Sequence, residues 1–76
     1  MISELDSVVL SHDIEEHGLR KGDIGAVVHC YDDGLAYEVE FVTGEGETVA
    51  ILTLDAQDIR SMYSGEILHA RELLSA

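Results

Sequence analysis

The chain has 76 residues, a single cysteine and a formal net charge of −12, from 16 Asp and Glu residues against 4 Lys and Arg residues. This length predicts one domain. One cysteine cannot form an internal disulfide, which is typical of a reducing compartment such as the cytoplasm. The charge argues against binding to DNA or RNA, because that affinity comes largely from Lys and Arg side chains that neutralise phosphates.

The sequence also argues against secretion and membrane insertion. Residues 1–6 carry acidic side chains where a secretory signal peptide has Lys or Arg followed by an apolar run. The longest apolar stretches, such as residues 49–52, have the length of a strand, whereas a spanning helix needs about 20 residues. We therefore expect a cytoplasmic protein with no membrane or nucleic-acid partner.

Residues 1–60 alternate between short apolar runs and turn residues, which is the pattern of a small antiparallel sheet. We predict strands over residues 6–11, 24–31, 35–42 and 47–54, and then a 3₁₀ turn over residues 55–60 that leads into a short fifth strand. Asp33-Gly34 is the strongest hairpin signal, because a type I′ turn needs positive φ at both central positions. The fold class that we expect is all-β.

Alternation with a period of two assigns side chains to the two faces of each strand. In the third strand it turns Tyr37, Val39 and Phe41 inward. In the second strand the set that contains Ile24 and Val28 is the more apolar, so we expect that set to face inward. The predicted core consists of Val9, Ile24, Val28, Val39, Phe41 and Leu52.

The C-terminal extension, residues 61–76, is open to two interpretations. The composition of residues 65–76 favours a helix, but a helix this short is marginal alone, and residues 66–73 could equally add a strand to an open barrel edge. Its apolar side chains are too numerous for a segment left free in water. We expect the extension to pack on the barrel (residues 1–60) or on a second subunit, as a homodimer with contacts at Ile67, Leu68, Leu73 and Leu74.

The order of these elements resembles an SH3-like barrel of the KOW type, with a re-entry into the barrel through Gly18, Gly22 and Gly25. This resemblance implies a small SH3-like antiparallel barrel of about five strands with the short extension, and many functions share that fold, so it implies no activity.

A closer resemblance is to a family of short bacterial proteins classed as a domain of unknown function, and it covers most of residues 5–60. It rests on the motifs Asp6-x-Val8-Val9-Leu10, Gly18-Leu19-x-x-Gly22-Asp23-x-Gly25-x-Val27-Val28, Ala36-Tyr37-Glu38-Val39-Glu40-Phe41 and Asp58-Ile59-Arg60. Members of that family are often encoded near toxin–antitoxin-like genes, which implies a partner-binding role and supplies no catalytic residue.

Glu38 and Glu40 are two residues apart on one strand, so they share a face at a spacing of roughly 7 Å. That spacing would suit a pair of acid–base carboxylates, but an outward strand face offers no desolvation to raise either pKa. We therefore expect a non-enzymatic protein-interaction module, antitoxin-like or accessory to a basic partner protein. Its acidic binding surface would consist of Glu38, Glu40 and Asp32.

The alternative function is a small-molecule or divalent-metal-binding module. His12 and His17 lie in one polar loop with Asp13, Glu15 and Glu16, which could fold around a divalent ion. His29 and Cys30 are adjacent on a strand and point to opposite faces, so they cannot both bind one ion without distortion. Beyond this alternative, we expect no cofactor.

Overall fold

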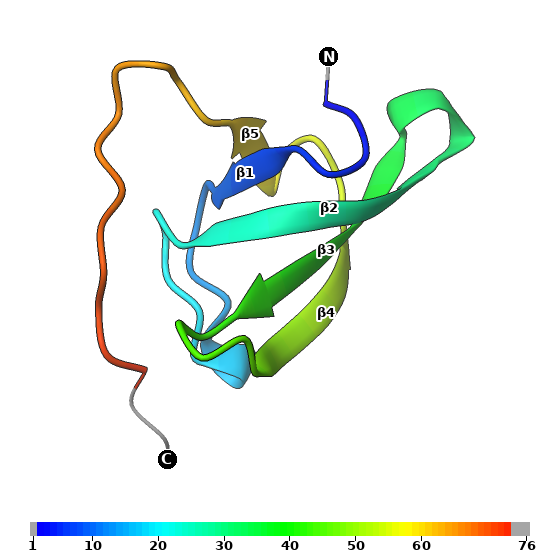
Figure 1. Ribbon diagram of the computed structural model, residues 1–76. Helices are drawn as coiled ribbons and strands as arrows, with labels where there is room; N and C mark the ends of the chain where they lie inside the picture. The colour runs from blue at the N-terminus through cyan, green and yellow to red at the C-terminus, as the bar shows by residue number, and fades with distance from the viewer. Residues whose placement is uncertain (1, 74–76) are drawn as a thin grey trace.

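The protein is a five-stranded antiparallel sheet with two short 3₁₀ turns, as seen in the computed structural model, which describes residues 2–73 (Figure 1). The elements in chain order are β1 (Ser7–Leu10), η1 (Glu15–His17), β2 (Ile24–Tyr31), η2 (Asp32–Gly34), β3 (Ala36–Val42), β4 (Thr48–Leu54) and β5 (Ile59–Ser61). The strand order across the sheet is β4-β3-β2-β1-β5. The prediction of an all-β, barrel-like fold with five strands is confirmed.

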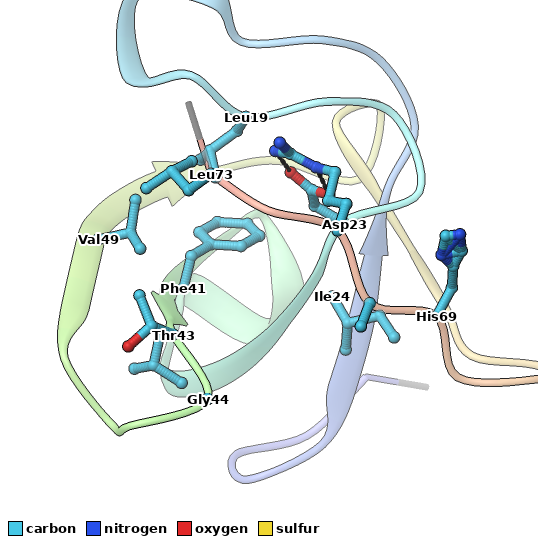
Figure 2. Close-up of a pocket in the computed structure, with 12 residues that line it drawn as sticks. Leu19, Asp23, Ile24, Phe41, Thr43, Gly44, Val49, His69 and Leu73 are labelled. Atoms are coloured by element: carbon cyan, nitrogen blue, oxygen red, sulfur yellow. Dashed lines mark hydrogen bonds and ion pairs between the residues drawn. The ribbon is translucent and has the colours of Figure 1, made fainter. Parts of the chain in front are cut away.

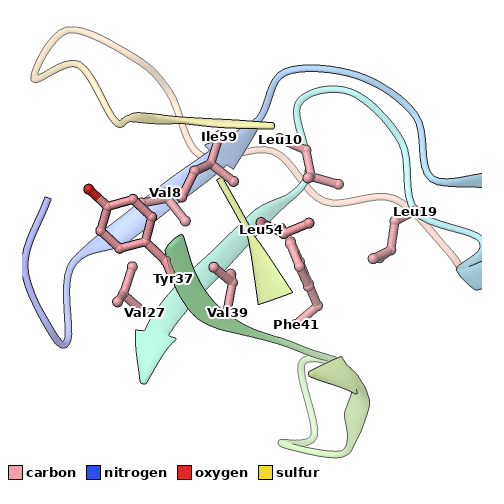
Figure 3. Close-up of a cluster of buried hydrophobic side chains, with 9 residues drawn as sticks. All are labelled: Val8, Leu10, Leu19, Val27, Tyr37, Val39, Phe41, Leu54 and Ile59. Atoms are coloured by element: carbon pink, nitrogen blue, oxygen red, sulfur yellow. The ribbon is translucent and has the colours of Figure 1, made fainter. Parts of the chain in front are cut away.

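The sheet coils around one apolar core to which every strand contributes (Figure 3). The buried cluster consists of Val8, Leu10, Leu19, Val27, Tyr37, Val39, Phe41, Leu54 and Ile59. The inward side chains of β3 are those that the alternation predicts, and they are 5% exposed or less. All nine lie between Val8 and Ile59, so the core is complete before the C-terminal extension begins.

The predicted inward face of β2 is wrong. Val27 is fully buried, whereas Val28 is 42% exposed. Gly25 is also buried and faces the same side as Val27, where it leaves room for the side chains of β3. The pairing of β2 with β3 shifts between Val27 and His29, a β-bulge that returns Cys30 to the inward side. An uninterrupted alternation cannot reproduce this pattern.

Three further members of the predicted core lie outside the cluster. Val9 is buried, but its neighbours Val8 and Leu10 supply the core side chains of β1. Ile24 is half-buried, and Leu52 packs against the cluster while remaining partly exposed. In β1, Val8, Val9 and Leu10 are all buried, so apolarity alone does not identify the side chains that join the core cluster.

The β2–β3 hairpin is longer than a type I′ turn allows. Tyr31 pairs with Ala36, so four residues connect the strands, and three of them form η2. Gly34 has a φ of 92°, a value at which glycine carries no steric penalty. The hairpin is therefore present as predicted, but with a different turn.

The C-terminal segment over residues 62–73, which we call the strap, is neither the helix nor the added strand that its sequence predicts. It leaves β5 and runs back along one side of the barrel in an extended course, orange to red in Figure 1. Ile67 and Leu68 are 90% and 70% exposed. A helix this short is marginal unless its apolar side chains pack on the rest of the protein, and Ile67 and Leu68 remain largely exposed.

Candidate functional site

The face of β2, β3 and β4 that is turned away from the core carries Glu38 and Glu40 side by side, as the alternation predicts. Both side chains are half-buried. Thr53 Oγ1 donates a hydrogen bond to Glu38 Oε1, and Thr48 Oγ1 donates one to Glu40 Oε2, each at 2.6 Å. Each hydroxyl holds one oxygen of its carboxylate, which fixes the side chain and keeps its negative charge at the surface.

Exposed apolar side chains share this face with the two carboxylates. Ile51 is paired with Glu40 across β3 and β4 and is 51% exposed, and Val42, two residues along β3, is exposed to the same extent. On β2 the rings of His29 and Tyr31 meet edge to face, with centroids 4.5 Å apart. We call this surface the outer face, and it comprises His29, Tyr31, Glu38, Glu40, Val42, Ile51 and Thr53.

The sheet region is acidic throughout. Between Ile24 and Leu54 the acidic residues are at positions 32, 33, 38, 40, 45 and 47, and every Lys and Arg of the chain lies outside that range. Asp32 belongs to η2, at the tip of the hairpin, and has a φ of 43°. The structure therefore brings Glu38 and Glu40 together on the sheet and places Asp32 in the turn beyond it.

His12 lies in the polar loop, where it makes an ion pair. Its Nε2 is 2.6 Å from Asp58 Oδ1, and its Nδ1 is 2.9 Å from the Asp13 carbonyl oxygen. The hydrogen bond with Asp58, followed by that with Asp13, raises the pKa of His12 above its ordinary value. His17 is in η1, and among residues 2–73 no group of three or more His, Cys, Asp or Glu side chains could hold a metal ion. The alternative metal-binding function stays a prediction. In this structure His12 is paired with Asp58.

The start of the strap is held by Arg60. Its guanidinium binds Glu66 through two hydrogen bonds, Nη1 to Oε1 at 2.9 Å and Nη2 to Oε2 at 2.6 Å, and lies 4.4 Å from the centre of the Tyr63 ring. The Tyr63 amide donates to Glu66 Oε1 at 2.7 Å. These contacts, with Arg60 the largest contributor, lower the pKa of Glu66 to about 2.

The far end of the strap is held by Arg71. Its Nε donates to Asp23 Oδ1 at 2.8 Å, and its Nη2 donates to Asp23 Oδ2 at 2.5 Å and to the Gly18 carbonyl oxygen at 2.9 Å. Partial burial acts to raise the pKa of Asp23, but the hydrogen bonds from Arg71 and from the Arg20 amide outweigh it and leave that pKa below its ordinary value. Arg71 thus makes a bidentate ion pair with an acidic residue of the barrel.

An apolar surface of the barrel lies beside this ion pair. We call this surface, together with Asp23, the Asp23 groove. It is formed by Leu19, Asp23, Phe41 and Val49 together with the Gly18 carbonyl. A cavity of about 330 Å³ remains between the groove and residues 69–73 of the strap (Figure 2). Leu73 lies close to the barrel here: a Cβ atom placed at Gly18 would be 3.6 Å from Leu73 Cδ1.

The predicted dimer contacts therefore divide into separate positions. Leu73 lies beside the barrel of its own chain and is 39% exposed, whereas Ile67 and Leu68 are 90% and 70% exposed. Leu74 lies outside the described residues. Dimerisation through Ile67 and Leu68 stays a prediction.

Sequence reasoning missed the Asp23 groove and both anchors of the strap. The signal that could have found them is the scarcity of cations, since Arg60 and Arg71 are two of only 4 Lys and Arg residues and both bind acids far along the chain or across a turn.

The fold and these surfaces define a small acidic β-sheet domain. Residues 4–61 match the model of the family described as "Domain of unknown function (DUF4926)", and the chain belongs to this family. Neither a curated protein nor a solved structure matches the chain. The matched range ends where β5 ends, so the strap lies beyond it.

Residues 2–73 include no helix with the length and apolar character that crossing a bilayer requires.

Proposed function

We propose that the protein is a non-enzymatic interaction module that binds a basic partner protein through the outer face. The observation that carries this proposal is the placement of Glu38 and Glu40 on an exposed sheet face, each oriented by a threonine hydroxyl. Lys or Arg side chains of the partner would pair with these carboxylates. Its apolar groups would cover Val42 and Ile51, in the combination of apolar and polar contacts that interfaces use.

The overall charge supports the same partner chemistry. A protein with a net charge of −12 attracts a basic surface over a distance and repels acidic ones, which raises the rate of association and selects against wrong partners. Between Ile24 and Leu54 the chain carries acidic residues and neither Lys nor Arg, so no cation in this range opposes the attraction.

In its concrete form the role is antitoxin-like or accessory. A protein that acts on nucleic acid needs a basic surface for phosphates. An array of fixed carboxylates can cover such a surface and so block its activity.

The test begins with affinity capture of the partner from the cells that make the protein, followed by purification of that partner and measurement of Kd. We expect the double variant Glu38→Gln/Glu40→Gln to bind at least tenfold more weakly, with most of the loss in the rate of association at low salt. Glutamine keeps an acceptor for each threonine hydroxyl, so the variant removes charge with little change of shape.

The matched control is Glu45→Gln/Glu47→Gln, which removes the same charge from the turn before β4. Equal loss in both double variants would mean that net charge alone drives binding and would contradict a role for the outer face. In the antitoxin-like form, expression of the partner alone arrests growth and co-expression of the protein relieves the arrest. An arrest that persists with the wild-type protein would contradict that form.

A further inference from the structure

We infer that the Asp23 groove is a peptide-binding site for an extended segment of the basic partner that carries an arginine and, two residues later, a leucine. In this structure the protein's own Arg71 and Leu73 occupy it. The inference rests on the proposed function for the nature of the partner, but it concerns a second surface of the barrel.

The groove has the donor and acceptor arrangement that a guanidinium requires. Both oxygens of the Asp23 carboxylate and the Gly18 carbonyl oxygen accept hydrogen bonds from Arg71. A planar guanidinium can satisfy all three at once, whereas a lysine ammonium cannot make the paired contact with a carboxylate. The site is therefore selective for arginine.

The groove also has an apolar position, which takes the side chain two residues after the arginine. Leu73 reaches Gly18, next to Leu19, and residues 69–73 leave a cavity of about 330 Å³ above Phe41 and Val49 (Figure 2). A partner segment with larger apolar side chains around its leucine would fill this space better than the strap does. The resident segment is thus an incomplete occupant.

The strap can leave the groove without the loss of a helix or strand. It has no regular secondary structure over residues 62–73, and Ile67 and Leu68 between its two anchors are 90% and 70% exposed. Its release would break the contacts of Arg71 and Leu73 and leave the core intact, since that core lies between Val8 and Ile59.

The groove belongs to the barrel that the family model matches, over residues 4–61, whereas the strap lies beyond that range. The acceptor is therefore part of the matched barrel, and its occupant lies outside the match. A strap in this position competes with a partner at the effective concentration of a short tether, which is in the millimolar range.

A basic partner suits the groove better than a second copy of this chain. Two copies each carry a net charge of −12 and repel one another. Asp23 binds the guanidinium, and Asp13 and Glu15 line a cavity beside it with one further cation, Arg20, so the acids outnumber the cation there and attract a basic segment. The charge decides between these two occupants.

The test uses the full chain with Arg71→Asp, which places two carboxylates together and so expels the strap. The probe is a fluorescent peptide with the sequence of residues 65–76, whose binding is measured by anisotropy. We expect the Arg71→Asp chain to bind the peptide at least about tenfold more tightly than the wild-type chain does, because the strap no longer competes. Circular dichroism checks that the variant keeps its fold.

A charge exchange supplies the matched control. Asp23→Arg in the full chain should reject the wild-type peptide and bind a peptide in which Arg71 is replaced by Asp. The addition of Glu38→Gln/Glu40→Gln to the Arg71→Asp chain should leave peptide binding unchanged, which separates the groove from the outer face. Failure of the peptide to bind the Arg71→Asp chain would overturn the groove and leave the proposed function standing.

The last experiment tests whether the partner identified by capture binds in the groove. We expect that partner to displace the peptide from the Arg71→Asp chain. A partner that binds the chain without displacing the peptide overturns the assignment. A wild-type dimer by light scattering that Asp23→Asn dissociates would show that a second copy fills the groove and would overturn it as well.

Discussion

Gly25 of β2 lies directly against Phe41 of β3: a Cβ atom at position 25 would be 2.8 Å from Phe41 Cε1, and 2.6 Å from Val39 Cγ1. Real Cβ atoms do not approach other atoms this closely, so any side chain here must displace the core of the barrel. The side chains of Val39 and Phe41 can lie over the backbone of β2 at this point only because residue 25 has no side chain.

We therefore predict that Gly25→Ala destabilises the protein by about 1–3 kcal/mol, the usual cost of overpacking a core. Chemical unfolding in urea measures the change. Gly44→Ala is the control, because a Cβ at Gly44 would meet no atom within 4 Å. Equal unfolding midpoints for the two variants would show that the barrel has more room at β2 than this structure allows.

The inverted face of β2 gives a second prediction from two adjacent valines. Val27 is fully buried and Val28 is 42% exposed. Val27→Ala should cost about 2 kcal/mol, from lost burial and the cavity that remains, whereas Val28→Ala should change the free energy of unfolding by less than about 0.5 kcal/mol. The reverse order would restore the pattern that the sequence predicts. Thermal unfolding of both variants under one set of conditions decides between the two registers.

The sequence predicts β3 correctly because that strand alternates cleanly between apolar and acidic residues, and Tyr37 and Glu38 cannot exchange faces at low cost. It fails on β2 because the residues on both sides of the strand are apolar or small from Ile24 to Val28. Gly25 contributes nothing to an apolarity comparison, although it is the residue that marks the inner face. The bulge after Val27 then changes the phase of the alternation, which single-sequence patterns do not reveal.

The candidate site divides in the same way. Glu38 and Glu40 are found from local spacing, because two residues along a strand share a face whatever the fold. The ion pair between Asp23 and Arg71 joins residues 48 positions apart. Its existence depends on the course of a strap whose composition favours a helix. The long-range contact of Arg71, together with the local pair of Arg60 and Glu66, overrides that local propensity.

The ion pair of His12 predicts a pH dependence of stability. Because the hydrogen bonds to Asp58 and Asp13 raise the pKa of His12 in the folded state, the folded protein holds this proton more tightly than the unfolded chain does. The stabilisation is fully present below the ordinary histidine pKa of about 6.5 and is lost as the pH rises through the higher pKa of the folded state. Unfolding midpoints in urea between pH 5.5 and 9 should therefore fall across that window.

His12→Gln should remove this fall, because the glutamine side chain does not titrate. His17→Gln, on the same loop in η1, is the control and should retain it. An unchanged pH profile in His12→Gln would show that the pair with Asp58 contributes nothing to folding.

At acid pH the opposite dependence is expected for Asp58, whose pKa is lowered by the Asp55 amide and then by His12, so its contribution is lost as the pH falls.

The exposed Ile67 and Leu68 predict self-association of the strap in its own right. At low salt two chains with a charge of −12 repel each other, and at physiological ionic strength salt screens that repulsion beyond a distance of about 8 Å. We expect light-scattering mass to rise toward that of a dimer as salt and protein concentration increase. Ile67→Ser/Leu68→Ser should stay monomeric, because the apolar contact that offsets the repulsion is gone, whereas Leu35→Ser, which changes a side chain 73% exposed on the hairpin, should behave as the wild type does. A monomeric mass for the wild type at every salt concentration would leave these two side chains solvated and contradict the dimer.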